Sequence, residues 1–130
     1  MAPRFDLIGM VVADMAATLA FYRRLGLDIP SDADDQPHVE TTVQGVRLAW
    51  DTVATVHSFD AEWAAPKGGH RMSLAFVCDG PAEVDSVHAD LVAAGYRSHQ
   101  DPWDAFWGQR YATVLDPDDN PVDLFAWLPK

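Results

Sequence analysis

Cysteine and basic side chains are scarce in this sequence. Cys78 is the single cysteine, so no disulfide can form within the chain, and its place in the apolar run "SLAFVC" predicts a buried thiol. Nine Lys and Arg against 20 Asp and Glu give a formal net charge of −11. Such a charge repels phosphate backbones and anionic membrane surfaces, so we expect no nucleic-acid or membrane partner. The free thiol favours a reducing cytoplasm as the location.

Long apolar runs are also missing. The first run, Leu7 to Ala13, has seven residues and stops at Asp14, which is too short for a signal peptide or a membrane span. The β-rich letters "LIGMVV" predict instead a buried strand. Asp14 is a favourable helix N-cap, and apolar residues then recur at helical spacing until Gly26, so a helix is predicted directly after the strand.

The same order recurs in the second half of the chain. The apolar stretch "MSLAFVCDG" predicts a strand, and a helix follows it with Pro81 in its first turn and Gly95 at its end. After each helix the sequence turns to extended runs, around Gln44-Gly45 in the first half and around residues 116–120 in the second. Strand, helix and hairpin therefore repeat at an interval of roughly 65–70 residues.

This repeat predicts an α+β fold of two βαβββ modules in tandem, about 1–65 and about 66–130, within a single domain of residues 1–130. The third strand of each module is the least marked, near Leu27 to Ile29 and near Tyr96 to His99. Neither module is large enough to bury its sheet alone, so we expect the two sheets to pair and to enclose a concave surface.

Several segments carry a resemblance to a known family. "GMVVADMAATLAFYRRLGLDIP" resembles the opening βα unit, and "WGQRYATVLDPDDNPVDLF" the closing hairpin, of the vicinal oxygen chelate superfamily, which includes glyoxalase I, extradiol dioxygenases and bleomycin-resistance proteins. "GVRLAWDTV", "EWAAPKGGHRMSLAF", "AGY" and "PWDAFWGQRYA" are most similar to antibiotic-binding proteins of the mitomycin-resistance type. The resemblance implies curved mixed sheets around a cleft, and a homodimer in which modules can be exchanged between chains.

Enzymes of this superfamily, as the resemblance implies, hold a divalent ion with side chains from the first and last strands of each module. Counting along the strands and aligning the two hairpin turns places these positions at Leu7, Leu48, Ser73 and Asp123. Only Asp123 is a good metal ligand, and the histidines show no HxH, HxxxH or HExxH spacing. We therefore expect no metal, no cofactor and no catalytic residue. A Ser/His/Asp triad stays open, although no nucleophile elbow is present.

Tryptophan is abundant, with five residues in the chain. The segment "HQDPWDAFWGQ" is rich in turn residues and holds Trp103, Phe106 and Trp107, and we interpret it as a surface connection whose large rings cover something. Core packing explains any one of these rings as well as ligand stacking does. As a group they favour a binding site.

Strand alternation adds candidates. Leu48 would put Trp50 on the cavity face, and Asp123 would put Phe125 there. A two-residue turn at Gln44-Gly45 would place His38 on the face opposite Trp50, whereas a bulge would bring it to the same face.

Acidic side chains near the mouth favour a cationic guest, and Arg110 either donates to a ligand or pairs with Asp104. The predicted ligand-binding residues are Trp107, Trp103, Phe106, Trp50, His38, Asp51, Tyr111, Arg110 and Asp123.

These features predict a resistance protein that sequesters a planar aromatic or quinone-type antibiotic, mitomycin-like or bleomycin-like, by stacking and without turnover. Two alternatives remain: a metal-dependent lyase or dioxygenase of the same superfamily, and a carrier for a natural-product biosynthetic intermediate. The expected partners are the small molecule and a second copy of the chain.

Overall fold

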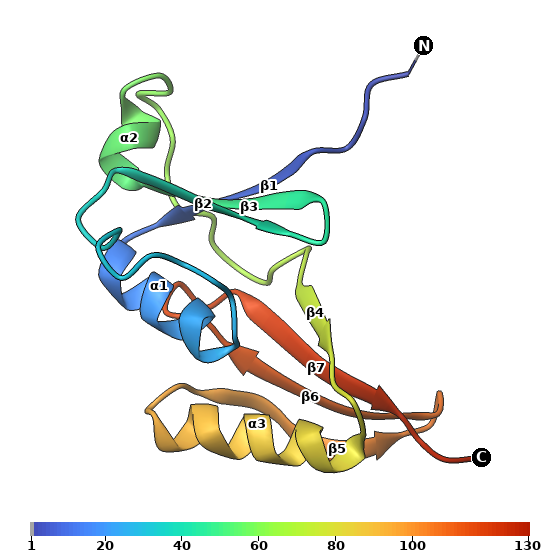
Figure 1. Ribbon diagram of the computed structural model, residues 1–130. Coiled ribbons are helices and arrows are strands. Elements are labelled where there is room, and N and C mark those ends of the chain that lie inside the picture. The colour runs from blue at the N-terminus through green and yellow to red at the C-terminus, as the bar shows by residue number, and fades with distance from the viewer. Residues whose placement is uncertain (1) are drawn as a thin grey trace. The chain divides into compact units, whose positions relative to one another are not determined.

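The computed structural model describes residues 2–130, which divide into two compact units (Figure 1). The first unit ends at Lys67 and the second is Gly68–Lys130. Each unit holds one mixed sheet, of three strands in the first and four in the second, with helix packed on it. The fold is therefore α+β with two sheets, as the sequence predicts.

The first unit consists of β1 (Leu7–Val12), α1 (Met15–Arg24), β2 (His38–Val43), β3 (Val46–Thr52) and α2 (Val53–His57). Its strand order is β1-β3-β2, with β1 parallel and β2 antiparallel to β3. Asp14 caps α1 as predicted, because its side chain accepts a hydrogen bond from the amide of Ala17 at 3.0 Å. Gln44 and Gly45 form the two-residue turn, with φ angles of 50° and 85°.

Helix α1 covers one face of this first sheet. The ring of Tyr22 lies 5.3 Å from that of Trp50, and the Tyr22 hydroxyl donates to Sδ of Met10 at 3.4 Å. Side chains alternate across a strand, so the partners His38 and Asp51 point to the opposite face. We call that opposite face the open face of the first sheet.

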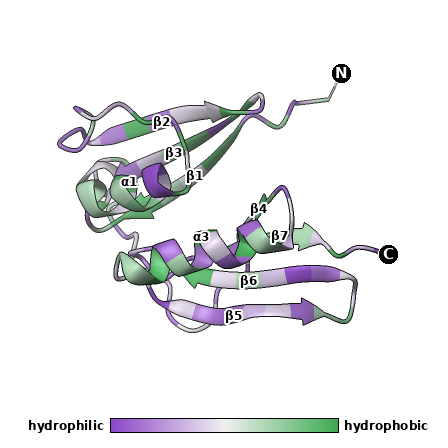
Figure 2. Cartoon of the chain, turned by 60° about the horizontal axis from the view of Figure 1, so that its bottom comes forward, coloured by the Kyte–Doolittle hydropathy of each residue, from purple (hydrophilic) through white to green (hydrophobic). Residues whose placement is uncertain are grey.

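The second unit consists of β4 (Leu74–Val77), α3 (Pro81–Ala93), β5 (Ser98–Ala105), β6 (Gln109–Leu115) and β7 (Pro121–Trp127). Its strand order is β4-β7-β6-β5, with β4 parallel to β7 and the other pairs antiparallel. Hydrophobic and hydrophilic residues alternate along α3 (Figure 2), and Val84 and Leu91 are fully buried. They face the buried Val122 and Leu124 of β7, so the other side of the second sheet is its open face.

The segment around Trp103 differs from the sequence-based expectation of a surface connection. It forms β5, and only residues 106–108 make the turn to β6. Strand β5 lies at an edge of its sheet and has register shifts on both sides of Gln100, which let an edge strand accept Pro102. Conversely, the extra strand expected near Leu27 to Ile29 does not form in the described chain, and α2 was not expected.

Asp116 holds the turn between β6 and β7. Its carboxylate is 3% exposed and accepts hydrogen bonds from the amides of Asp118 and Asn120, each at 2.9 Å, and from Nδ2 of Asn120 at 2.9 Å. Buried charged acceptors of this kind contribute more than surface ones.

We predict that Asp116→Ala lowers the free energy of unfolding by about 2–3 kcal/mol, because the half-buried amides of Asp118 and Asn120 lose a charged acceptor. Urea denaturation measures the change. Asp119→Gly in the same turn is the control: Asp119 has a φ of 65°, which glycine adopts freely, and only an exposed ion pair with Arg97 is lost. A loss as large in the control as in Asp116→Ala would contradict this role for Asp116.

Candidate functional site

A connected group of aromatic side chains lies on the open face of the second sheet and at the adjoining turn. Register places Trp103 beside Tyr111 and Tyr111 beside Phe125, so rings from β5, β6 and β7 meet on one face. We call this group the aromatic cluster; its members are Trp103, Phe106, Trp107, Tyr111, Phe125 and Trp127.

Trp107 is the centre of the aromatic cluster. Its ring centroid lies 5.5 Å from Trp103, 5.0 Å from Phe106 and 5.4 Å from Tyr111, in edge-to-face contacts. Gly108, with a φ of 93°, allows the sharp turn that presents the indole, and Nε1 of Trp107 donates to Oε1 of Gln109 at 2.7 Å. The indole is therefore held from several sides.

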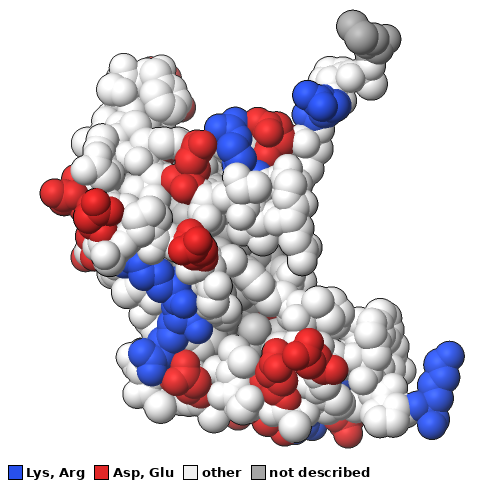
Figure 3. Space-filling model, in the orientation of Figure 1, with Lys and Arg blue, Asp and Glu red and all other residues white. Residues whose placement is uncertain are grey.

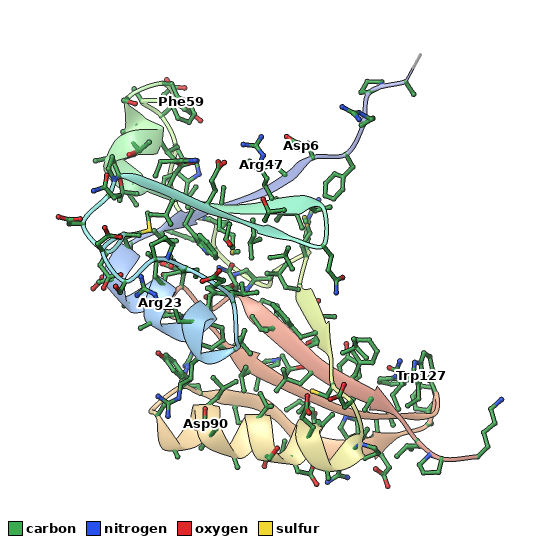
Figure 4. All side chains as sticks on the ribbon, viewed as in Figure 1. Asp6, Arg23, Arg47, Phe59, Asp90 and Trp127 are labelled. Atoms are coloured by element: carbon green, nitrogen blue, oxygen red, sulfur yellow. The ribbon has the colours of Figure 1, made fainter. Side chains whose placement is uncertain are left out.

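The aromatic cluster is nevertheless a surface feature. Phe106 is 90% exposed, Trp127 67% and Trp107 45%, whereas Trp50 in the core of the first unit is 0% exposed. Figure 4 shows Trp127 among further ring side chains at the end of β7. Rings packed only to enlarge a core would lose most of this exposure, so the cluster offers ring surface to a ligand.

Asp123 forms the polar end of this face. Its Oδ2 accepts hydrogen bonds from the hydroxyls of Tyr111 at 2.7 Å and Ser73 at 3.1 Å, and its Oδ1 accepts from the hydroxyl of Thr113 at 2.7 Å. Burial and, second, the bond to Asp123 raise the pKa of Tyr111 to about 12. Tyr111 thus joins the two parts of the site, because its hydroxyl binds Asp123 and its ring stacks on Phe125 at 6.3 Å.

The open face of the first sheet carries a chain of charged side chains. His38 bonds Asp51 at 2.6 Å and Glu40 at 2.9 Å, and Arg47 links Glu40 to Asp6 at 3.0 and 2.6 Å; Arg47 and Asp6 lie side by side in Figure 4. The hydrogen bond to Glu40 and then that to Asp51 raise the pKa of His38 above its ordinary value. The two-residue turn puts His38 opposite Trp50, as the sequence predicts for that turn.

Two predicted ligand-binding residues lie away from the open faces. Trp50 is in the core against Tyr22, and its indole N–H has no hydrogen-bond partner in residues 2–130. Arg110 lies on the α3 side of the second sheet, where it pairs with Asp85 at 3.0 Å and with Asp104 at 3.1 Å. The pairing with Asp104 was one of the two predicted alternatives. We therefore leave Trp50 and Arg110 out of the site.

Aligning the two hairpin turns of the sequence also placed Leu48 on the wrong face of its strand. Gly9 of β1 lies two residues after Leu7 and pairs with Ala49, just as Ala75 of β4 lies two residues after Ser73 and pairs with Asp123. Ala49 is therefore the counterpart of Asp123, and Leu48 shares the α1-covered face with Trp50. The alignment is wrong by one residue because the two hairpin turns differ in length. Equivalent positions in the two last strands are identified by their pairing with the first strand of each unit, and not by their distance from the turn.

The positions that the resemblance assigns to metal ligands are thus Leu7 and Ala49 in the first unit and Ser73 and Asp123 in the second. Leucine and alanine have no donor atom, and Asp123 is engaged by three hydroxyls, so this donor set does not fit a divalent cation. Within residues 2–130, no group of three or more His, Cys, Asp or Glu side chains is arranged to hold a metal ion.

Ser98 contacts an aspartate and a histidine that the sequence did not identify as its neighbours. Ser98 donates to Asp101 at 2.6 Å, and its oxygen lies 2.7 Å from Nε2 of the buried His88. In a catalytic triad the carboxylate bonds the histidine and orients it. Here Asp101 bonds the serine and lies 3.6 Å from Nε2 of His88, the same ring nitrogen that contacts Ser98, whereas in a triad the two partners bind opposite ring nitrogens. The three side chains therefore join α3 to β5 and do not form a triad.

Some site residues were missed by sequence reasoning. Thr113 lies two residues from Tyr111 on β6, so strand alternation could have found it. Glu40, Arg47 and Asp85 join their networks through pairings that a sequence does not show. The buried thiol predicted for Cys78 is confirmed, and burial raises its pKa.

The model of the Glyoxalase/Bleomycin resistance protein/Dioxygenase superfamily matches residues 4–124. The chain therefore belongs to this superfamily, the one that the sequence resemblance indicates. No curated protein matches it significantly. Across residues 2–130, α1, α2 and α3 all lack the length and apolar character that crossing a bilayer requires.

Solved structures of the superfamily share the fold. A glyoxalase/bleomycin resistance protein/dioxygenase family enzyme from Burkholderia phytofirmans PsJN has a TM-score of 0.83 at 17% identity, covering 97% of this chain and 100% of that one. A superfamily protein from Nocardioides has 0.76 at 24%, covering 98% and 85%. A lactoylglutathione lyase from Agrobacterium tumefaciens has 0.67 at 20%, covering 96% and 94%.

We predict that Tyr111 ionises about two pH units later than an ordinary tyrosine, whose pKa is about 10. Asp123→Asn is expected to lower the pKa of Tyr111 partway, because the negative acceptor is lost while burial remains. Ultraviolet titration of the phenolate measures this, and Tyr111→Phe identifies the transition. Three tyrosines that titrate together near pH 10 would contradict the placement of Tyr111.

Proposed function

We propose that the protein binds a planar aromatic or quinone-type antibiotic on the aromatic cluster, inside the cell and without turnover, and so confers resistance by sequestration. The exposed indole of Trp107 at the centre of the cluster is the observation that carries the proposal. Mitomycin-like and bleomycin-like drugs are the guests that the sequence resemblance favours.

The energetics of stacking support this proposal. Each offset or edge-to-face ring contact contributes about 0.5–1.5 kcal/mol beyond area burial. Burial of ~300 Å² of apolar ligand surface at ~25 cal/mol per Å² contributes roughly 7 kcal/mol before association costs. Affinity in the micromolar range follows if several rings of the cluster take part.

The donor set supports binding over metal-dependent chemistry. Of the four positions that correspond to the metal site of the superfamily's enzymes, Leu7 and Ala49 offer no ligand atom. A lyase or dioxygenase that relies on a divalent ion would need other ligands. We also propose that the protein does not turn its ligand over. A stoichiometric divalent ion in the purified protein, together with an enzymatic activity that is lost when the ion is removed, would overturn this part of the proposal.

The charge of the protein supports a cationic or donor-bearing guest. The chain has a net charge of −11, and acidic side chains are spread over the surface seen in Figure 3, where basic ones form separate groups between them. Such a surface attracts cations over roughly 8–10 Å at physiological salt.

We expect Trp107→Ala to weaken binding of the best ligand from a panel of mitomycin C, bleomycin and a naphthoquinone by at least about tenfold, because a central ring is lost. Isothermal titration calorimetry measures the dissociation constants. Phe59→Ala is the matched control, since it removes an exposed ring of the first unit. Equal affinity in the unmodified protein, Trp107→Ala and Phe59→Ala would show that the aromatic cluster does not bind the ligand.

A growth experiment in living cells distinguishes a resistance role from a carrier role. A drug-sensitive host that expresses the chain is expected to grow at higher drug concentration, and Trp107→Ala is expected to abolish that gain. Binding without any gain in growth would favour a carrier of a biosynthetic intermediate instead.

The proposed working unit is a homodimer. Large apolar side chains of the second unit outside the aromatic cluster are exposed, among them Met72, Val77 and Val92, and a second copy would cover surface of this kind. Sedimentation equilibrium is expected to give twice the chain mass. A monomer mass at every concentration tested would contradict this part of the proposal.

A further inference from the structure

Beside the aromatic cluster lies a polar group made of Asp123 and the three hydroxyl side chains that surround it. All three hydroxyl protons of this group point to the carboxylate of Asp123. The hydroxyls of Ser73, Tyr111 and Thr113 all donate to the carboxylate of Asp123. A hydroxyl has one proton and two acceptor lone pairs, and an ionised carboxylate has about four acceptor positions and no proton. With three protons already committed to Asp123, the group presents only acceptor positions to a ligand.

The charge of Asp123 is not neutralised by these contacts. Its three partners are neutral hydroxyls, and Arg110, the cation nearest along β6, lies on the α3 side with Asp85 and Asp104. Oδ1 accepts one hydrogen bond and Oδ2 accepts two, so acceptor capacity remains on Oδ1. The half-buried carboxylate therefore favours a donor, above all a charged one.

Asp123 lies where a ligand stacked on the aromatic cluster would meet it. Asp123 and Phe125 point to the same face of β7, and the ring of Tyr111 spans from Asp123 to Phe125 and Trp107. A flat molecule on these rings brings its edge to the acceptor group. A carbonyl at that edge would meet lone pairs, whereas an N–H or O–H would form a hydrogen bond.

We propose that Asp123 makes the site selective for flat aromatic ligands that carry an N–H or O–H donor, preferably on a cationic group, over ligands that present only carbonyl or other acceptor groups. This inference rests on the proposed function, because it assumes that the aromatic cluster binds a planar guest. It narrows the guest class to amine-bearing or hydroxyl-bearing aromatic compounds, and it excludes quinones that lack such a donor.

Three acridines test this selectivity with the full chain at mildly alkaline pH. Acridine is neutral and has no N–H, N-methylacridinium is a cation without N–H, and 9-aminoacridine is a cation with N–H donors. Calorimetry is expected to show 9-aminoacridine binding about tenfold more tightly than acridine. N-methylacridinium is expected to lie between them, because it gains attraction but no hydrogen bond.

Two variants identify the group responsible. Asp123→Asn is expected to bring 9-aminoacridine and acridine to within about threefold of each other, because charge is lost and an amide donor is gained. Ser73→Ala, at an exposed position, frees an acceptor position on Asp123, so the preference for 9-aminoacridine is expected to stay or to grow. Loss of the preference in Ser73→Ala would overturn the assignment to the carboxylate.

The outcomes separate this inference from the proposed function. If the three acridines bind equally well and Trp107→Ala weakens all of them, the selectivity is wrong and the stacking site stands. N-methylacridinium bound as tightly as 9-aminoacridine would also overturn the donor requirement. If none of the acridines or panel antibiotics binds, the proposed function fails.

Discussion

Side-chain alternation along β6 and β7 is the constraint from which the site follows. Every second side chain faces α3, and apart from Arg110 these side chains are buried, as Ala112, Val122 and Leu124 are. The intervening positions must then share the other face, which brings Tyr111 and Phe125 into one stacked pair and sets Asp123 beside them. A shift of register by one residue would bury the rings and expose the core, so packing of α3 fixes the site as firmly as it fixes the fold.

In the proposed site, the same face would combine two kinds of ligand recognition, ring stacking and hydrogen bonding, that act over different ranges. Ring stacking at Trp107 acts over short distances, is tolerant of ligand identity and depends on flatness. The acceptor group around Asp123 is directional and depends on protons that the ligand must supply. Together they would give a binder that accepts a class of molecules and still discriminates within it, which is what sequestration of a family of related natural products requires.

Much of the architecture could be predicted from the sequence, because it depends on local signals. Asp14 and Pro81 mark helix starts, and Gly26 and Gly95 mark helix ends, at the positions where the structure has them. The site could be predicted only in part. Trp103, Phe106 and Trp107 are conspicuous by type, but Trp50 is equally conspicuous and lies in the core, since the covered face of β3 depends on where α1 packs.

The remaining differences have specific causes. A short strand was expected near Tyr96 to His99, where β5 begins at Ser98. Its continuation to Ala105 escaped prediction because Pro102 and two register shifts disguise the alternation. Leu48 was placed on the wrong face because hairpin turns of unequal length were aligned with each other. Hydrogen bonds between distant residues, such as Ser73 to Asp123, depend on strand order, which a single sequence does not show.

The central claim is that a flat ligand lies on the exposed rings of the second unit. Proton–nitrogen correlation spectra of the five indole N–H groups test it most directly, because each tryptophan gives its own signal. Addition of a bound planar ligand is predicted to shift the signals of Trp103, Trp107 and Trp127 and to leave the buried Trp50 in place. Saturable binding that shifts Trp50 while the three cluster signals stay unmoved would contradict the account.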